Sequence, residues 1–470
     1  MITFTICLFV LIIGYFVYGR FVEKVFGADD RPTPAITKAD GVDFIPMPAW
    51  KLFMIQFLNI AGLGPIFGAI MGAKFGTASY LWIVLGSIFA GATHDYIAGM
   101  LSLRNSGENL PDIIGRYLGK NAKLIMRIFT IVLMVLVGAV FVAGPAGLIA
   151  NLTPSALNTT FWMIVIFIYY LLATLLPIDK IIGRVYPIFA AALLFMAIGV
   201  LVMLYVNMPV LPEIWDGLEN THPNAEKLPI FPIMFVSIAC GAISGFHATQ
   251  SPLMARCMKK EKYGRPVFYG AMIVEGMVAL VWAAAATYFF QKNGMGESNA
   301  AVIVNDITNS WLGVVGGILA ILGVIAAPIT SGDTALRSAR LIIADFFNIE
   351  QKSIKKRLLI CVPMFACTFL LLLYSLRDAA GFDLIWRYFS WANQTLSVFT
   401  LWAITVFLVR ERKGLYFIIT LIPALFMTAI CASYICVAPE GFGILPDFSL
   451  VIASVVAAIS LVLFSIWYAK

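Results

Sequence analysis

Charge is scarce in this chain of 470 residues, since only 12% of them are Asp, Glu, Lys or Arg. An ordinary soluble domain carries about 25% charged residues and roughly 45–50% apolar ones. Here 61% of the residues are hydrophobic and the mean hydropathy is +0.93. Too little polar surface is present to cover one water-soluble body. The composition therefore excludes a cytosolic enzyme, a secreted disulfide scaffold and a disordered chain, and it predicts a polytopic membrane protein.

Several chemical signatures are also missing. The seven cysteines have no metal-ligand spacing and fall mostly in apolar stretches, as is typical of small apolar fillers. No His-Glu-x-x-His motif occurs, which disfavours an intramembrane protease, and no Gly-x-x-x-x-Gly-Lys loop occurs, which disfavours an ATP-powered pump. No enzyme activity and no cofactor are expected. A secondary transporter is favoured, and a channel or a membrane nutrient sensor is the alternative.

Apolar runs of the length that crosses a bilayer, about 20 residues, occur thirteen times. Because they lack a period-two alternation, they are predicted to be helices and not barrel strands. The predicted spans are 2–18, 51–72, 78–101, 123–145, 160–176, 184–207, 231–256, 267–290, 313–341, 358–375, 386–409, 414–437 and 447–469. The first is predicted to be a retained helix, since it has neither the basic flank nor the cleavage site of a signal peptide.

The basic residues test this helix count, because Lys and Arg collect on the cytoplasmic side of short connections. With thirteen spans, 27 of the 32 basic residues fall on one side of the membrane. The other five are Lys74, Lys227, Lys292, Arg377 and Arg387. This distribution predicts an external amino terminus and a cytoplasmic carboxyl terminus. The net charge of +7 is then an orientation signal, and no nucleic-acid partner is expected.

Glycine and proline cluster in two of the predicted spans, at 59–65 in the second and at 241–252 in the seventh. One interpretation is close helix packing through small residues. The other follows from the five-helix spacing between them, which makes 51–207 and 208–409 two five-helix repeats of opposite orientation. Broken helices at matching places in inverted repeats point to the substrate site of a transporter. Residues 1–50 would add an amino-terminal helix with a cytoplasmic loop, and 410–470 two carboxyl-terminal helices.

A broken helix exposes amide donors at one half-helix and carbonyl acceptors at the other. The amides suit an anionic group of a substrate and the carbonyls suit a cation. Glycines at such a break let the backbone approach a ligand closely. The predicted substrate-binding residues are Asn59, Gly62, Gly64, Ser244, Gly245, Phe246, His247 and Gln250.

Polar side chains inside the other spans are few. A charge at the membrane centre costs at least about 2.5–3.5 kcal/mol, so such residues face a cavity or a partner by default. In the ninth span, Thr330, Ser331 and Asp333 supply hard oxygen ligands that suit Na⁺ or a proton relay better than a transition metal.

For the remaining polar groups, a gating role and a structural role are both open. His94 and Asp95 can pair with each other. Glu275 and Arg387 can snorkel or lie at the interface, and Asn393 and Gln394 can join helices by hydrogen bonds.

Four motifs, in this order along residues 50 to 400, resemble the carbon starvation protein family. They are 58–65 (LNIAGLGP), 244–251 (SGFHATQS), 328–335 (PITSGDTA) followed by 337–340 (RSAR), and 386–394 (WRYFSWANQ), and His94-Asp95 also fits. The resemblance implies a transporter of the bacterial cytoplasmic membrane that takes up peptides or pyruvate, with a core similar to the leucine-transporter fold. The longest members have additional carboxyl-terminal helices, whose features are not carried over.

The resemblance also implies a cation site. Its ligands would be backbone carbonyls of Leu58 and Ala61 together with Ala327, Thr330 and Ser331. Asp333 and the two intramembrane histidines allow proton coupling as well, because histidine titrates near neutral pH. The expected mechanism is alternating access, in which a small carboxylate-bearing nutrient binds between the two broken helices and Na⁺ or H⁺ drives its uptake.

Overall fold

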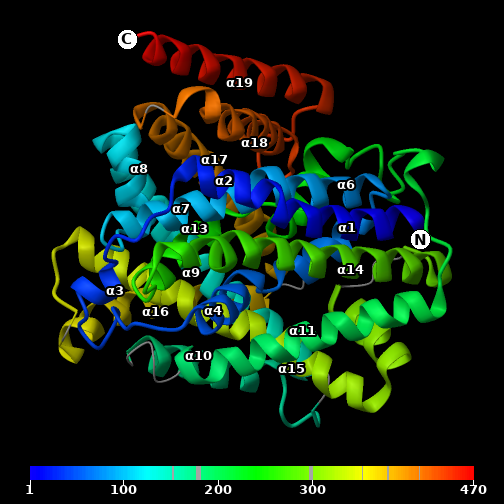
Figure 1. Cartoon of the computed structure of the whole chain (residues 1–470). Coiled ribbons are helices and arrows are strands. Elements are labelled where there is room, and N and C mark those ends of the chain that lie inside the picture. Colours follow the sequence, from blue (N-terminus) through cyan, green and yellow to red (C-terminus); the bar gives the residue numbers. More distant parts are fainter. Residues whose placement is uncertain (151–152, 176–181, 296–299, 352, 378–380, 412) are drawn as a thin grey trace.

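The computed structural model shows a bundle of helices (Figure 1). It describes the chain except residues 151–152, 176–181, 296–299, 352, 378–380 and 412. Among the described residues no strand occurs, and the one β-type contact is an isolated bridge between Met47 and Met258. The predicted all-helical class is confirmed.

The first half of the chain supplies eleven α-helices. Their bounds are α1 Ile2–Phe16, α2 Tyr18–Phe26, α3 Pro34–Thr37, α4 Ala49–Ala61, α5 Ala69–Ala73, α6 Ala78–Leu85, α7 Ala92–Arg104, α8 Leu110–Leu118, α9 Lys120–Ala150, α10 Thr159–Leu175 and α11 Ile182–Asn207. Wider π-type turns at Gly64–Gly68 and Gly86–Gly91 join α4 to α5 and α6 to α7.

The second half supplies eight more. Their bounds are α12 Phe235–Ile238, α13 Gly245–Ala255, α14 Ala271–Asn293, α15 Ala300–Phe346, α16 Ile354–Arg377, α17 Gly381–Arg410, α18 Ile418–Val437 and α19 Pro446–Tyr468. Further π-type turns precede α12 at Ile230–Met234 and α14 at Arg265–Gly270.

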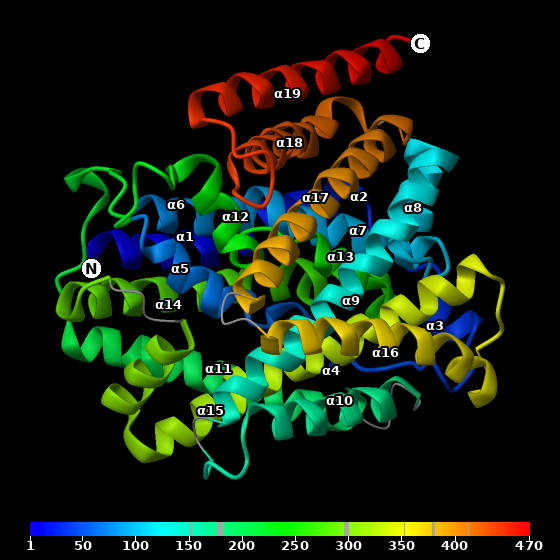
Figure 2. The ribbon, with the colours of Figure 1, turned by 180° about the vertical axis from the view of Figure 1, so that it is seen from behind.

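The described residues of the thirteen predicted spans lie on these helices and on the short segments that join them. Among the described residues, ten helical segments are long and apolar enough to cross a bilayer, and the bent pair of α4 with Gly64–Ala73 makes an eleventh. The helix α10 is apolar but shorter, and the predicted span 313–341 lies inside the 47-residue α15. Helices α18 and α19 lie at one edge of the bundle (Figure 2), where α19 leaves Val451 and Leu463 more than 60% exposed, as lipid contact requires.

The second predicted span is broken as expected. Helix α4 ends at Ala61, and Gly62 has a φ of +36°, a conformation that side chains disfavour. Helical structure resumes at Gly64. The next residue, Pro65, lacks the N–H that would continue the hydrogen bonds of α4. The two halves of the span are bent by 54°.

The seventh predicted span is broken too, but the break begins earlier and is shorter than 241–252. Helix α12 ends at Ile238, Ala239 has a φ of +41°, and Ser244 is extended. From Gly245 the helix α13 runs through Pro252 to Ala255 without interruption. Pro252 therefore does not mark the break. It falls in the eighth position of α13, and the carbonyl that it leaves without a partner is tolerated in a membrane helix.

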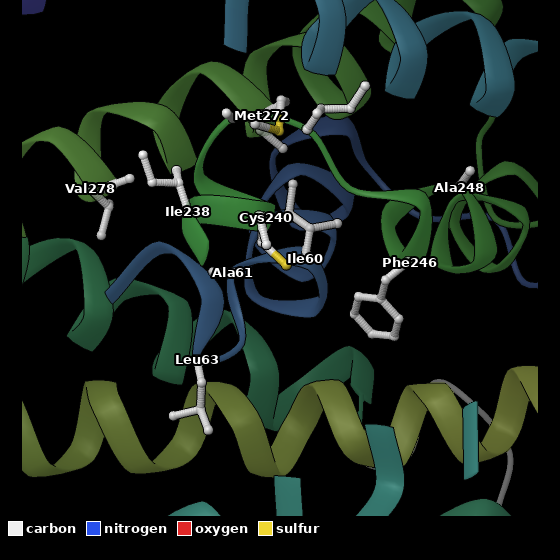
Figure 3. Packing of buried hydrophobic residues seen from close by; sticks show 14 of the residues in the cluster. Ile60, Ala61, Leu63, Ile238, Cys240, Phe246, Ala248, Met272 and Val278 are labelled. Atoms are coloured by element: carbon white, nitrogen blue, oxygen red, sulfur yellow. The ribbon is translucent and has the colours of Figure 1, made fainter. Parts of the chain in front are cut away.

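The two breaks pack directly on each other, as Figure 3 shows for Cys240 beside Ile60 and Ala61. A Cβ atom on Gly64 would overlap the side chain of Cys240, with its Sγ only 2.7 Å away. A Cβ atom on Gly68 would lie 2.7 Å from the carbonyl oxygen of Ile238. Small-residue packing and helix breaking thus occur together, because the glycines that interrupt one helix let the other approach.

Candidate functional site

A fully buried network of acidic and imidazole groups lies beside the second break. Both carboxylate oxygens of Asp95 on α7 are engaged at 2.8 Å, Oδ1 with Nδ1 of His94 and Oδ2 with Nδ1 of His247. His247 is the third residue of α13, so the network ties the start of this half-helix to α7. The predicted pairing of His94 with Asp95 is confirmed, and it extends to His247.

Glu275 on α14 completes this network. Its Oε2 lies 3.4 Å from Nε2 of His247, and its side chain is fully buried. The interpretation of Glu275 as a snorkelling or interfacial residue is therefore wrong. Three helices that are distant in sequence, α7, α13 and α14, meet through four ionisable side chains, here called the relay: His94, Asp95, His247 and Glu275.

The second break is held by α17. Oδ1 of Asn393 accepts hydrogen bonds from the backbone N–H of Phe246 at 2.6 Å and from the hydroxyl of Ser244 at 3.0 Å. Nε2 of Gln394 donates to the carbonyl of Ile243 at 2.9 Å. Gly245 lies so close to α17 that a Cβ atom there would be 2.5 Å from the carbonyl oxygen of Asn393. Asn393 and Gln394 thus satisfy backbone groups that the break would leave unpaired.

The first break is tied to α15 at the predicted cation ligands. The hydroxyl of Ser331 lies 3.0 Å from the carbonyl oxygen of Leu58 and 2.9 Å from that of Ala327. The hydroxyl of Thr330 contacts the carbonyls of its own helix, with Ala327 at 2.8 Å. Leu58, Ala327 and Ser331 are therefore brought together. Ala61 is buried in the same break, one turn after Leu58.

Asp333 belongs to a different cluster from the relay. Its Oδ2 accepts a 2.6 Å hydrogen bond from the hydroxyl of Tyr186 on α11. The same hydroxyl lies 3.1 Å from the carbonyl oxygen of Thr330. Both side chains are fully buried. Asp333 and His247, the two predicted coupling residues, thus have separate hydrogen-bond partners.

Buried amides without a protein partner mark the first break. Both side-chain polar atoms of Asn59 and of Gln56, one turn before it, are buried without a hydrogen bond, as is Oε1 of Gln250 on α13. Such groups cost free energy unless a ligand or water satisfies them. A Cβ atom on Gly62, beside them at the end of α4, would lie 2.9 Å from the ring of Phe141.

A cavity of about 450 Å³ opens near the far ends of both broken helices. Its lining includes Lys74, His222, Trp386, Arg387 and Glu440. Arg387 is 46% exposed and pairs with the buried Glu440 at 3.2 Å, in agreement with an interfacial position. Burial, and secondly the ammonium of Lys74, lower the pKa of His222, so its imidazole is neutral at physiological pH.

Aromatic rings connect this cavity to the second break. Trp386 lies 5.5 Å from Phe389, Phe389 lies 5.8 Å from Phe141, and Phe141 lies 6.2 Å from Phe246, all between ring centroids. Phe141, Phe389 and Phe246 are at most 1% exposed. These three buried rings, Phe141, Phe246 and Phe389, are here called the aromatic partition. Trp391, on the same helix as Phe389, donates to the carbonyl of Cys431 and is not part of this partition.

The opposite ends of the broken helices are closed by charged groups. Oδ1 of Asp43, in the loop before α4, lies 3.8 Å from Nη1 of Arg337 and 3.7 Å from Nη2 of Arg340 on α15. The same loop pairs with the end of α13 through the N–H of Met47 and the carbonyl of Cys257. Both arginines are among the 27 basic residues that the sequence assigns to connections on one side, but the structure places them within α15, where each is at most 1% exposed.

The profile described as "Carbon starvation protein CstA" matches residues 1–156, 146–316 and 293–433. The chain belongs to the carbon starvation protein family. An uncharacterised membrane protein of Haemophilus influenzae is 43% identical over an aligned length of 341 residues, and the alignment covers 62% of this chain and 92% of that protein. The Bacillus subtilis "Peptide transporter CstA" is 29% identical over 529 residues, covering 90% of this chain and 88% of the relative. The Escherichia coli "Pyruvate/proton symporter BtsT" is 29% identical over 341 residues, covering 59% and 48%.

Solved structures show the same architecture. MhsT in complex with L-phenylalanine superposes with a TM-score of 0.59 over 81% of this chain and 96% of that one, and a Na⁺-coupled sialic acid symporter with 0.56 over 96% of each. The sequence identity is 14% in both cases, so the likeness concerns the fold alone. It confirms the predicted leucine-transporter-like fold for this family member.

Several residues of the site could not be predicted from the sequence. Tyr186 has no local signal, because a tyrosine in an apolar helix usually only packs. Gln56 lies one turn outside the glycine cluster, and Asp43 precedes its helix. Glu275 did carry a signal, as a carboxylate within an apolar span, but its partner could not be read from sequence spacing.

Removing the hydroxyl of Tyr186 should destabilise this family member. Tyr186→Phe leaves Oδ2 of Asp333 without its 2.6 Å donor in a buried place, and a lost hydrogen bond to a charged group costs about 1.5–3 kcal/mol. Thermal unfolding of the purified protein should show a lower midpoint. Tyr205→Phe on the same helix is the control, since Tyr205 is 39% exposed and should leave the midpoint unchanged. Equal midpoints for the two variants would show that the Tyr186 bond contributes nothing.

Proposed function

We propose that this protein is a secondary active transporter that takes up small carboxylate-bearing nutrients, peptides or pyruvate, by alternating access. The observation that carries the proposal is the crossing of two broken helices at a buried centre, where Asn59 and Gln250 hold polar atoms without protein partners. Discontinuous helices at equivalent places in two halves of a membrane fold are typical of a transport site. The relatives named peptide transporter and pyruvate/proton symporter support the same substrate class.

The substrate site lies at the two breaks. Asn59 and the neighbouring Gln56 supply amide donors and acceptors, and the start of α13 supplies a positive dipole end for a carboxylate. Gly62 and Gly245 shape the site by letting Phe141 and α17 pack closely on the two breaks. The predicted residues Gly64 and Ser244 support the site from within, since Gly64 packs on Cys240 and Ser244 bonds to Asn393. No nucleic acid and no cofactor take part.

A cation gradient drives the uptake. The carbonyl oxygens of Leu58 and Ala327 each lie within 3.0 Å of the hydroxyl of Ser331. Carbonyl and hydroxyl oxygens are the donors that a hard cation prefers. These residues would hold Na⁺ together with Thr330 and Ala61, and the relay and Asp333 offer protonatable groups. The coupling ion is therefore Na⁺ or H⁺.

Two closures on opposite sides of the centre make the access alternate. The aromatic partition separates the site from the 450 Å³ cavity, and Asp43 with Arg337 and Arg340 closes the other side. The basic residues place the Asp43 side in the cytoplasm of a bacterial cell, with the amino terminus outside. The cavity is then the external vestibule, and substrate reaches the breaks when the aromatic rings move.

Binding and exchange measurements on the purified protein test this function. Pyruvate, dipeptides and tripeptides are compared by thermal shift, and the ligands that stabilise are then tested in proteoliposomes for counterflow of the radiolabelled compound. Saturable counterflow is expected for a carrier. Conductance without counterflow would indicate a channel, and binding without any movement across the membrane would indicate a sensor, so either result contradicts the proposal.

Opening the aromatic partition should uncouple transport. Phe389→Ala removes the ring between Trp386 and Phe141, and truncating a buried Phe costs about 3–5 kcal/mol of packing. We expect steady-state accumulation to fall several-fold, while the initial rate of counterflow is kept or raised. Phe448→Ala, at a 64% exposed position of α19, is the control. Unchanged accumulation in the Phe389 variant would show that the partition does not seal the pathway.

A further inference from the structure

The relay contains acceptors that its visible donors do not satisfy, since Nε2 of His94, Nε2 of His247 and both carboxylate oxygens of Glu275 are buried without a hydrogen-bond partner. An ionised Asp95 can only accept at its two oxygens, so each imidazole beside it then carries a proton on Nδ1. In a neutral His247 the other ring nitrogen, Nε2, is then a lone pair, and it faces Oε2 of Glu275 at 3.4 Å. Two buried acceptors that face each other repel unless a proton lies between them.

The charges of the relay lead to the same conclusion. Without the extra proton, two carboxylates are buried with two neutral imidazoles, and their charge is uncompensated inside the protein. With it, either Glu275 is a neutral acid that donates to His247, or His247 is a cation between two carboxylates. In both states one negative charge is removed, which lowers the large cost of burying unpaired charge.

The groups that face the relay come from every element packed against it. His247 interacts electrostatically or by hydrogen bonds with Glu275 on α14, with Asp95 on α7 and with the thiol of Cys240 in the second break. Asp95 interacts in the same way with the two histidines. Among the described residues, no group of three or more His, Cys, Asp or Glu side chains is arranged to hold a metal ion. A proton is thus the ligand that the relay fits.

We propose that the His247–Glu275 pair is the proton-binding site that couples transport, with Asp95 and His94 as positioning residues. This rests on the transport function proposed above. His247 lies three residues after Ser244, at the end of the second break. The residue before it, Phe246, donates its backbone N–H to Asn393. A bound proton joins α13 to α14 through a hydrogen bond. When the proton is lost, Nε2 of His247 and Oε2 of Glu275 face each other as two acceptors and repel. This repulsion moves the start of α13, and the substrate site and the aromatic partition move with it.

The test uses the full chain in Na⁺-free proteoliposomes that contain a pH-sensitive dye, with pyruvate and an alanyl dipeptide as probes. For the wild type, entry of the transported probe should acidify the lumen, and an imposed pH gradient should drive accumulation. Glu275→Gln keeps the shape and removes the titratable group, so it should retain counterflow while acidification and accumulation are lost. Glu23→Gln, a partly exposed acid paired with Arg265 elsewhere, is the matched control and should behave as the wild type.

Other results of this experiment would contradict the proposal. Acidification that persists in Glu275→Gln, or that is lost in Asp333→Asn alone, would overturn the proposal, as would wild-type transport that requires Na⁺ and moves no proton. A wild type that moves neither probe, with or without Na⁺, would refute the transport function itself. If Glu275→Gln does not fold, Glu275→Asp carries the test. It keeps the acid but moves it away from His247, so coupled transport should show a shifted pH profile, and an unchanged profile would count against the site.

Discussion

Replacing Gly64 with alanine is expected to abolish transport, and a second substitution should restore it. The new Cβ atom would overlap the side chain of Cys240, where the two broken helices cross. Overpacking of a tight core contact costs about 1–3 kcal/mol. Here the cost falls on the contact between the two half-helices that form the substrate site. Counterflow of the transported substrate in proteoliposomes measures the effect.

A second substitution, at Cys240, tests whether the overlap with this side chain causes the loss. Cys240→Gly removes the side-chain atoms that the new Cβ atom at position 64 would strike, so the double variant should regain most of the counterflow that Gly64→Ala loses. Gly147→Ala is the matched control, because a Cβ atom at Gly147 of α9 would meet no atom within 4 Å. A fully active Gly64→Ala protein, or a double variant no better than the single one, would show that the crossing tolerates separation.

With the orientation proposed above, neutralising Asp43 should open the cytoplasmic side. Asp43→Asn removes the carboxylate that lies between the buried guanidinium groups of Arg337 and Arg340. Breaking a buried ion pair by removing one partner costs about 3–5 kcal/mol. Because this pairing exists only when the loop before α4 is docked on α15, the loss shifts the protein toward the inward-open state. Uphill accumulation should fall by roughly tenfold or more, since about 1.4 kcal/mol already changes an equilibrium tenfold.

A native cysteine reports this opening. Cys257 is buried, and its thiol contacts the carbonyl oxygen of Asp43. Its labelling by a maleimide, assigned by mass spectrometry, should be much faster in Asp43→Asn than in the wild type. Asp30→Asn, which removes an exposed acid paired with Lys262 on the same side, should not change it. Equal labelling rates in all three proteins would refute a gate at Asp43.

The elements that the sequence could predict are those with a local cause. Runs of apolar residues define the spans, and Gly62, Gly64 and Pro65 break a helix through their own backbone chemistry. The predicted position of the second break was wrong for two reasons. Ala239 adopts a positive φ although its residue type does not indicate it, and Pro252 lies inside α13 without interrupting the helix. Tertiary packing on α17 decided this position.

The candidate site was predictable as a set of residues but not as a set of partners. His94, Asp95, His247 and Glu275 were each visible as ionisable groups in apolar spans, yet their pairing depends on how α7, α13 and α14 come together. The role of Asn393 was open for the same reason, because its partners are backbone groups of a distant break. The division into 1–50, 51–207, 208–409 and 410–470 stays a prediction from the hydropathy pattern.

Accumulation against a gradient tests the central claim most directly. Purified protein in proteoliposomes is given inward H⁺ and Na⁺ gradients, and the internal concentration of the transported carboxylate is followed before and after ionophores collapse both. Cation-coupled alternating access predicts accumulation above the external concentration that disappears on collapse, while counterflow continues. Accumulation that survives the loss of both gradients would contradict cation-coupled alternating access.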